Sequence, residues 1–166
     1  MARLKVVHFP ESVLKTKTAP VHTVTDADRA LVKDMIETMY AEKGVGLAAN
    51  QVAISKQIFV ASADQVRGKE LVIFNPKIVK KRGSIKEFEG CLSVPELYEP
   101  VKRAKTVWLR GTGLNGETIE LKAEGLLARI FQHETDHLNG FLFIDRLGPF
   151  KSRRVKRALL KKLGRA

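Results

Sequence analysis

The sequence at residues 132–140 is Gln-His-Glu-Thr-Asp-His-Leu-Asn-Gly, within an apolar run typical of a helix. Residues four apart share a helix face, so His133 and His137 can direct two imidazole nitrogens at one point. Glu134 follows about 100° around the helix, where its carboxylate can reach a metal-bound water without being a ligand. The alternative is an ordinary helix with two surface histidines. By chance alone, this pattern of two histidines and one glutamate would occur in roughly a few of a thousand such chains.

A catalytic metal site on such a helix needs a third protein ligand and one open position. No histidine or glutamate follows His137, and Asp145 is the only later acid. Upstream, the single cysteine, Cys91, has a glycine before it and Leu92-Ser93 after it, which indicates a turn. A lone cysteine is more often a small buried hydrophobic residue, but Cys91 with the two histidines would complete a Cys-His-His site. Such a site suits zinc and does not exclude iron, cobalt or nickel.

A third segment, residues 44–51, reads Gly-Val-Gly-Leu-Ala-Ala-Asn-Gln. Small residues let the backbone approach a ligand or another part of the chain closely. The segment is therefore either a tightly packed turn or a ligand-binding loop, and its composition does not decide between the two.

Composition sets broad limits on the protein class. A chain of 166 residues with 44% hydrophobic residues is long enough for one domain with a real core. One cysteine permits no intramolecular disulfide, which favours a reducing, cytoplasmic location. The first residues lack the apolar region of a signal peptide, and we expect no membrane partner. The net charge of +12 suggests a polyanionic partner or only high solubility.

The order of predicted elements gives the fold class. Thr25 and Asp28 form a potential capping box, and the helix they begin runs to about Lys43, with Gly44 as the C′ residue. Several strands follow: residues 58–60, residues 71–74 ending at Asn75-Pro76, residues 84–89, and a hairpin of residues 106–109 and 118–121 around Asn115-Gly116. The metal-binding helix begins after Glu124-Gly125 and ends at Asn139-Gly140. Without crossover helices between strands, this order predicts an α+β fold with mostly antiparallel sheets around the central helix.

The three segments, residues 44–51, 89–93 and 132–137, are similar to the three signature motifs of bacterial peptide deformylases, in that family's order. The resemblance covers the whole chain. It implies removal of the N-formyl group from nascent N-formyl-Met polypeptides, with Glu134 as the proton shuttle. It also implies that the Leu92 backbone N–H and the Gln51 side-chain amide stabilise the oxyanion. One divalent ion per chain is expected, Fe²⁺ in the cell, with Zn²⁺, Ni²⁺ or Co²⁺ possible in a purified sample.

Substrate contacts are expected beside the metal. Leu126 and Ile130 share the helix face of the two histidines, which predicts an apolar pocket, although such stripes are usually plain core. The resemblance adds Val45 and part of Arg129 to this pocket and makes the Val45-Gly46 backbone an edge for an extended peptide. It also pairs Glu89 with Arg103 to fix the cysteine loop; the alternative is a surface ion pair worth about 0–1 kcal/mol. Glu87 and Phe88 depart from the commonest pattern, so their roles stay open.

The C-terminal segment is strongly basic. Pro149 suits the first turn of a helix, and Val155, Leu159 and Leu163 form one narrow apolar stripe. We therefore divide the chain into a catalytic domain, residues 1–148, and a basic helix, residues 149–166. The helix either is only solvated or, as in similar bacterial proteins, holds a monomeric enzyme on ribosomal RNA. Two other classes stay open for the whole chain, namely another His-Glu-x-x-His peptidase and a basic RNA-binding protein with a structural metal.

Overall fold

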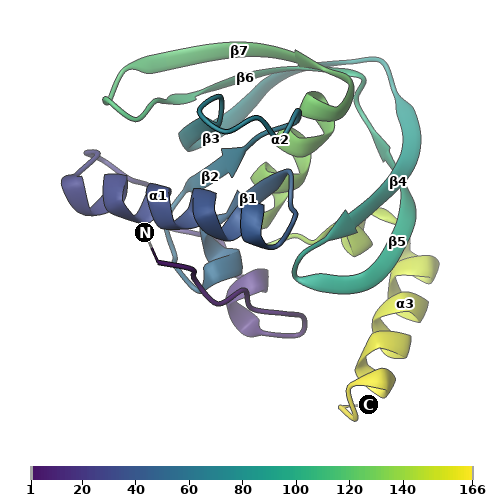
Figure 1. The fold of residues 1–166 in the computed structure, drawn as a ribbon. Coiled ribbons are helices and arrows are strands. Elements are labelled where there is room, and N and C mark those ends of the chain that lie inside the picture. Colours follow the sequence, from purple (N-terminus) through teal and green to yellow (C-terminus); the bar gives the residue numbers. More distant parts are fainter. Residues whose placement is uncertain (1, 166) are drawn as a thin grey trace.

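The computed structural model describes residues 2–165 and confirms the α+β class (Figure 1). Within these residues the strands form an antiparallel five-stranded sheet and a separate two-stranded hairpin. The five-stranded sheet has the order β1 (Gly46–Ala48), β2 (Ile58–Ala61), β3 (Leu71–Arg82), β6 (Thr106–Thr112), β7 (Thr118–Glu124). The hairpin consists of β4 (Ile85–Cys91) and β5 (Val94–Arg103).

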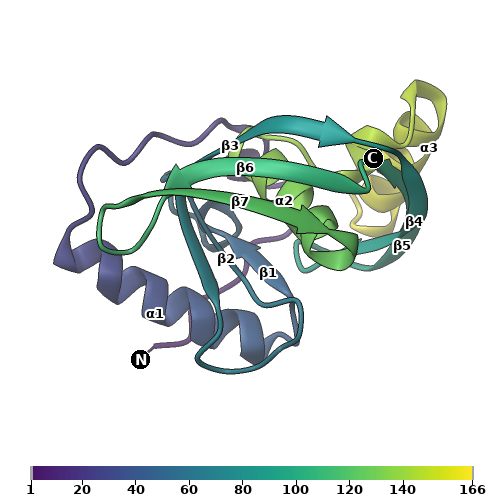
Figure 2. The same ribbon diagram turned by 90° about the horizontal axis from the view of Figure 1, so that it is seen from above.

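Three helices surround the strands in the described part of the chain: α1 (Asp26–Ala41), α2 (Gly125–Leu138) and α3 (Pro149–Lys162). Figure 2 shows α2 beneath β3, β6 and β7, with α1 and α3 at opposite ends of the molecule. Short 3₁₀ turns complete the chain: η1 (Ser12–Lys15), η2 (Ala49–Val52) and η3 (Phe143–Arg146). The helix that carries the His-Glu-x-x-His motif is therefore central, as predicted.

Strand β2 is buried on both faces, which explains its continuous apolar run. Phe59 packs with Phe131 of α2, their ring centroids 5.8 Å apart. Ile58 and Val60, on the other face of β2, pack in a cluster with α1 residues such as Met35. Alternate side chains of one strand thus join the two helices, and α2 is held firmly against the sheet.

The predicted capping box of α1 is present, because the Thr25 hydroxyl accepts from the Asp28 N–H and the Asp28 carboxylate accepts from the Thr25 N–H. The helix ends at Ala41, two residues before the predicted end, and the predicted C′ residue, Gly44, is wrong by one position. Lys43, with φ of 57°, takes the left-handed C′ position, and the Gly44 N–H reaches back to the Met39 carbonyl at 2.8 Å. This is the C″ bond of a Schellman motif. Gly44 itself has no left-handed φ.

One strand prediction also needs correction. Asn75-Pro76 does not end its strand, since β3 continues to Arg82 through a register shift between Phe74 and Lys77. Asn75 has a positive φ of 49° there, and its side-chain oxygen accepts from the Val21 N–H. The local bulge therefore replaces the predicted turn.

The C-terminal helix packs on the domain. Val155 is buried in a cluster with Phe143, and Leu159 is partly buried against it. Leu163, predicted to share this stripe, is 50% exposed, and Leu160 packs instead. No helix within residues 2–165 is both long enough and apolar enough to cross a lipid bilayer.

Candidate metal centre and substrate cavity

Helix α2 presents two buried histidines to one point. The Nε2 atoms of His133 and His137 lie 3.1 Å apart, and the rings meet edge to face. Phe143 of η3 stacks on the His133 ring with centroids 6.2 Å apart. The i, i+4 spacing thus brings both imidazoles together inside the protein rather than on its surface.

Cys91 completes this group of donors. It is the last residue of β4 and pairs with Val94 across a two-residue turn, as its neighbours predicted. Its Sγ lies 3.2 Å from His137 Nε2, and one donor atom from each of the three side chains lies within 4.8 Å of the others. Donors about 2.0–2.3 Å from a tetrahedral ion stand roughly 3.3–3.6 Å apart. The three residues therefore fit one metal ion with a further position open.

Glu89 organises the charged groups behind the centre. One carboxylate oxygen accepts from His133 Nδ1 at 3.0 Å, which directs Nε2 of that ring toward the cysteine. Arg103 pairs with the same carboxylate at 2.8 and 3.0 Å, and Arg129 Nη1 donates at 2.7 Å. Burial alone would raise the pKa of Glu89, but the hydrogen bonds from His133 and Arg103 outweigh it and hold the pKa far below its usual range.

The predicted pair of Glu89 with Arg103 is thus present, and it is buried rather than on the surface, because each side chain is about 5% exposed or less. Arg103 also donates to Asp136 at 2.6 Å, on the far side of α2. The hairpin that carries the cysteine is therefore tied to α2 by two ion pairs, Arg103 with Asp136 and Glu89 with Arg129. The contacts of Glu89 with His133 and with Arg129 were not predicted, since spacing along the chain says nothing about which side chains meet across two elements.

Glu134 lies beside the three donors and is itself buried. Its Oε2 atom is buried and has no hydrogen-bond partner in the described residues, so this oxygen remains an unused acceptor. Burial raises its pKa to about 7. Gly46 of β1 makes room for it, because a methyl group at that position would stand 2.4 Å from Glu134 Oε1. Gly46, in the small-residue segment, thus allows the backbone of β1 to lie close to the Glu134 side chain.

Gln51 of η2 also points into the centre. Its side-chain oxygen accepts from the Ala48 N–H at 2.8 Å, which turns its amide nitrogen toward Cys91 Sγ at 3.7 Å and Ser93 Oγ at 3.2 Å. Leu92 occupies the turn directly after Cys91. The three segments of the sequence therefore meet at one place, with two polar donors beside the metal ligands.

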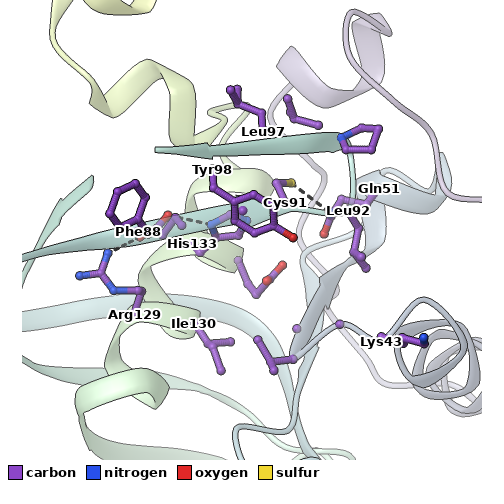
Figure 3. Close-up of a pocket in the computed structure, with 18 of the residues that line it drawn as sticks. Lys43, Gln51, Phe88, Cys91, Leu92, Leu97, Tyr98, Arg129, Ile130 and His133 are labelled. Atoms are coloured by element: carbon purple, nitrogen blue, oxygen red, sulfur yellow. Dashed lines mark hydrogen bonds and ion pairs between the residues drawn. The ribbon is translucent and has the colours of Figure 1, made fainter. Parts of the chain in front are cut away.

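A cavity of about 410 Å³ opens in front of these groups (Figure 3). It is lined by every substrate-contact residue predicted from the sequence: Val45, Gly46, Leu126, Arg129 and Ile130. Ile130 is 3% exposed and forms its inner wall, whereas Leu126 is 50% exposed at the entrance. The apolar face of α2 is therefore both core and cavity wall.

The hairpin supplies one cavity residue whose role the sequence left open, Phe88, and others that were not predicted, such as Tyr98. Phe88 and Tyr98 line the cavity and are 72% and 70% exposed. The Tyr98 ring lies over Gly90, where a methyl group would stand 2.5 Å from the ring. A glycine inside a strand often marks such a close approach. Gly90 was therefore the feature of the sequence that could have indicated a large side chain packed at this point. Glu87 contacts Arg129 Nε at 3.3 Å from the rim.

The fold and these groups are those of a metal-dependent hydrolase of the α+β class. A family model described as polypeptide deformylase matches residues 3–153. The chain is 47% identical over 161 residues to the peptide deformylase of Pseudoalteromonas translucida (strain TAC 125), covering 97% of this chain and 96% of that protein. It is 43% identical over the same length to the peptide deformylase of Buchnera aphidicola subsp. Schizaphis graminum (strain Sg), with the same coverage.

A similar structure is the crystal structure of a peptide deformylase from Legionella pneumophila, with a TM-score of 0.91 and 40% identity over 99% of this chain and 96% of that one. The chain therefore belongs to the peptide deformylase family.

Proposed function

We propose that the chain removes the N-formyl group from the N-terminal formyl-methionine of nascent polypeptides and releases formate. The observation that carries this proposal is the buried Glu134 carboxylate, which has one oxygen without a hydrogen-bond partner and lines the same cavity as the metal donors Cys91 and His133. A purely structural metal site needs four protein ligands and no adjacent free base. The family membership agrees with hydrolysis at such a centre.

The roles of the side chains follow from their positions. A divalent ion held by Cys91 and the two histidines would lower the pKa of its water and so supply a nucleophile near neutral pH. Glu134 takes a proton from the attacking water and returns it to the leaving amine, which its raised pKa of about 7 allows. The Gln51 amide, fixed by the Ala48 N–H, and the Leu92 N–H donate to the oxyanion of the tetrahedral intermediate. Loss of one such donor typically costs about 10²–10³ in rate.

Substrate placement uses the cavity and the edge of the sheet. β1 is the edge strand of the five-stranded sheet, and the Val45-Gly46 backbone lines the cavity. An extended peptide can therefore add to this edge by main-chain hydrogen bonds. Its methionine side chain, which is unbranched and flexible, then enters the space between Val45, Leu126, Arg129 and Ile130. Phe88 and Tyr98 on the rim meet later residues of the peptide.

Donor chemistry limits the metal to a few ions, and the resemblance to peptide deformylases selects among them. One soft thiolate and two imidazoles suit Fe²⁺, Zn²⁺, Co²⁺ and Ni²⁺. We infer Fe²⁺ in the cell, with Zn²⁺, Ni²⁺ or Co²⁺ able to occupy the centre of a purified sample.

The test is formate release from a short formyl-Met peptide, measured with metal content on the same anaerobically purified sample. Glu134→Ala should keep the metal, but its rate of formate release should fall by a factor of about 10²–10⁴, because the variant lacks a positioned acid–base group. Cleavage of internal peptide bonds instead of formate release would favour the peptidase alternative. Loss of metal from Glu134→Ala, with activity restored by added metal, would contradict the proton-shuttle role.

We also infer a cytoplasmic monomer that α3 holds on ribosomal RNA, so that residues 1–148 carry the catalysis and residues 149–166 carry the attachment. Four cations of α3 are exposed and make no ion pair within residues 2–165: Arg153, Arg154, Arg157 and Lys161. Others are partly neutralised, since Lys151, Lys156 and Lys162 pair with Glu99, Asp145 and Glu96. The exposed four are therefore the phosphate contacts to test.

Because Val155 is buried, deleting the helix would also uncover the core beneath it. Replacing the four exposed cations with glutamine avoids this problem. The quadruple variant should bind ribosomes more weakly than the wild type, most clearly at moderate salt, and should hydrolyse a short formyl-Met peptide at the wild-type rate. Equal ribosome affinity would rule out attachment through this helix.

A further inference from the structure

A second cavity, of about 740 Å³, lies on the other side of α2. Glu134 and Ile130 of α2 line the first cavity, whereas Thr135 and Asp136 line the second. Much of its remaining wall comes from the carboxyl half of β3, the turn into β4 and the end of β5, and Lys17, Gln57 and Arg146 complete it. None of the proposed catalytic, metal-binding or substrate-binding groups lines it, so the function proposed above does not account for it.

The walls of this cavity are strongly basic. Six cations line it against the one carboxylate of Asp136: Lys17, Lys77, Lys81, Lys102, Arg103 and Arg146. Asp136 is already paired with both arginines. Within residues 2–165 the four lysines make no salt bridge with any carboxylate. Four positive charges therefore share a concave surface without neutralisation.

The neighbouring hairpin adds to this charge. In the β4–β5 register Lys86 stands directly opposite Lys102, and cross-strand partners point to the same face. Like charges placed this way repel one another and destabilise a hairpin. An anion bound between them would relieve that repulsion.

Neutral donors are also available in the cavity. The Thr135 hydroxyl is buried without a hydrogen-bond partner in the described residues and lines this cavity. The turn residues Gly83 and Ser84 line it as well, and Gly83 has a φ of 67°. Backbone N–H groups and hydroxyls are common phosphate contacts beside lysines and arginines.

The size of the cavity and the distribution of the lysines indicate the kind of anion. The four unpaired lysines come from separate parts of the chain, namely Lys17, β3 and β5, and they line a cavity of about 740 Å³. This cavity is far larger than a single phosphate group, so its lysines can contact successive phosphates of a nucleic acid strand. We propose that this basic cavity, defined by Lys17, Lys77, Lys81 and Lys102, binds the sugar–phosphate backbone of RNA. It would be a second RNA contact, independent of α3.

The experiment uses the full-length, metal-loaded chain in which the four exposed α3 cations are glutamine, so that α3 does not mask the cavity. Binding of a short fluorescein-labelled single-stranded RNA is followed by anisotropy between about 50 and 200 mM salt. Lys77→Glu with Lys81→Glu should weaken binding by tenfold or more. It should also lower the slope of log K against log salt by about 1.4, because each neutralised phosphate of a single strand adds roughly 0.7 to that slope.

A matched control carries the same change of charge elsewhere. Lys33 of α1 and Lys69 are exposed and line neither cavity. Lys33→Glu with Lys69→Glu should leave RNA affinity within about threefold of its parent, because only the general charge changes. Equal losses in the two double variants would overturn the proposal, and so would complete displacement of the RNA by low-millimolar inorganic phosphate at constant ionic strength.

Formate release is measured on every variant. It should be unchanged in both double variants, since neither touches the metal centre or the first cavity. Absence of RNA binding together with normal formate release would therefore refute only the proposed RNA contact. The proposed hydrolysis is tested separately by the formate-release assay.

Discussion

Gly46 and Glu134 are in contact across the floor of the first cavity, where a methyl group on Gly46 would come within 2.9 Å of the Glu134 carboxylate carbon. Gly46 has no left-handed φ, so space and not backbone freedom requires the glycine. Since β1 is paired with β2 and cannot move away, the carboxylate must yield to any added side chain. The position of the proposed proton shuttle therefore depends on a residue from a different motif.

The first prediction follows from this contact. Gly46→Ala should lower kcat/KM for a formyl-Met peptide by about 10² or more, because positioned acid–base catalysis contributes about 10²–10⁴. Metal content should stay at the wild-type level, since no metal ligand is displaced. Gly113→Ala is the control, because its methyl group would meet only the end of the flexible Glu117 side chain. Wild-type activity of Gly46→Ala would show that Glu134 can act from another position.

The second prediction concerns the third metal ligand. Cys91→Ala should lose tight metal binding, because two histidines alone leave an incomplete site. Metal content after dialysis against a weak chelator measures this. Ser93→Ala, two residues further on, removes a hydrogen-bond partner of Gln51 but no metal ligand, and it should retain the ion. Near-stoichiometric metal in Cys91→Ala would refute the assignment.

The third prediction compares two neighbouring glutamates. Glu89→Gln leaves Arg103 and Arg129 without their buried counter-charge, and breaking such a pair costs about 3–5 kcal/mol of unfolding free energy. It also weakens the fixed orientation of His133, so metal affinity should fall roughly 10–100-fold.

Glu87→Gln is the matched control for that comparison. Its side chain is 52% exposed and contacts only the edge of Arg129, so the loss should be about 0–1 kcal/mol. Denaturant unfolding and metal titration of both variants measure the difference. Equal effects at the two positions would show that the buried carboxylate has no special role.

The fourth prediction concerns pH and the start of α1. Burial by itself raises the pKa of Asp28, but the hydrogen bonds from Lys56 and Thr25 outweigh it and lower the pKa to about 2. A carboxylate with a lowered pKa stabilises the folded state above its unfolded pKa of 3.8, and this contribution is lost as the pH falls toward 2. The shift corresponds to about 2 kcal/mol at neutral pH.

Asp28→Asn should therefore be less stable than the wild type at pH 7, and the difference should shrink between about pH 4 and pH 2. Urea unfolding at a series of pH values measures it. Asp26→Asn is the control, because the Asp26 side chain is fully exposed, and it should show little change at any pH. A difference between wild type and Asp28→Asn that does not depend on pH would contradict the assigned pKa.

Local chemistry explains which features could be predicted from the sequence. The capping box at Thr25, the Asn115-Gly116 hairpin and the glycine after Asn139 each depend on neighbouring residues, and the structure contains all three. The same is true of the two histidines on α2, whose spacing alone places them on one face.

Features that depend on distant contacts could not be predicted. β5 contains Pro95 and Pro100 and several charges, so it does not resemble a strand, but a two-stranded sheet consists only of edge strands, where proline is tolerated. The contact of Glu89 with His133, and the second cavity, arise where β4, β5 and α2 meet. The residue pattern within a single strand or helix does not indicate which other elements it will contact.

The split of the donor set between two elements has a mechanical consequence. Cys91 belongs to the β4–β5 hairpin, which is hydrogen-bonded only to itself as a sheet, whereas both histidines belong to α2. An ion bound by all three residues would thus act as a removable cross-link between the hairpin and the helix. Chelation should loosen the hairpin in particular, so that its backbone amides exchange with solvent faster while those of β2 and β3 stay protected.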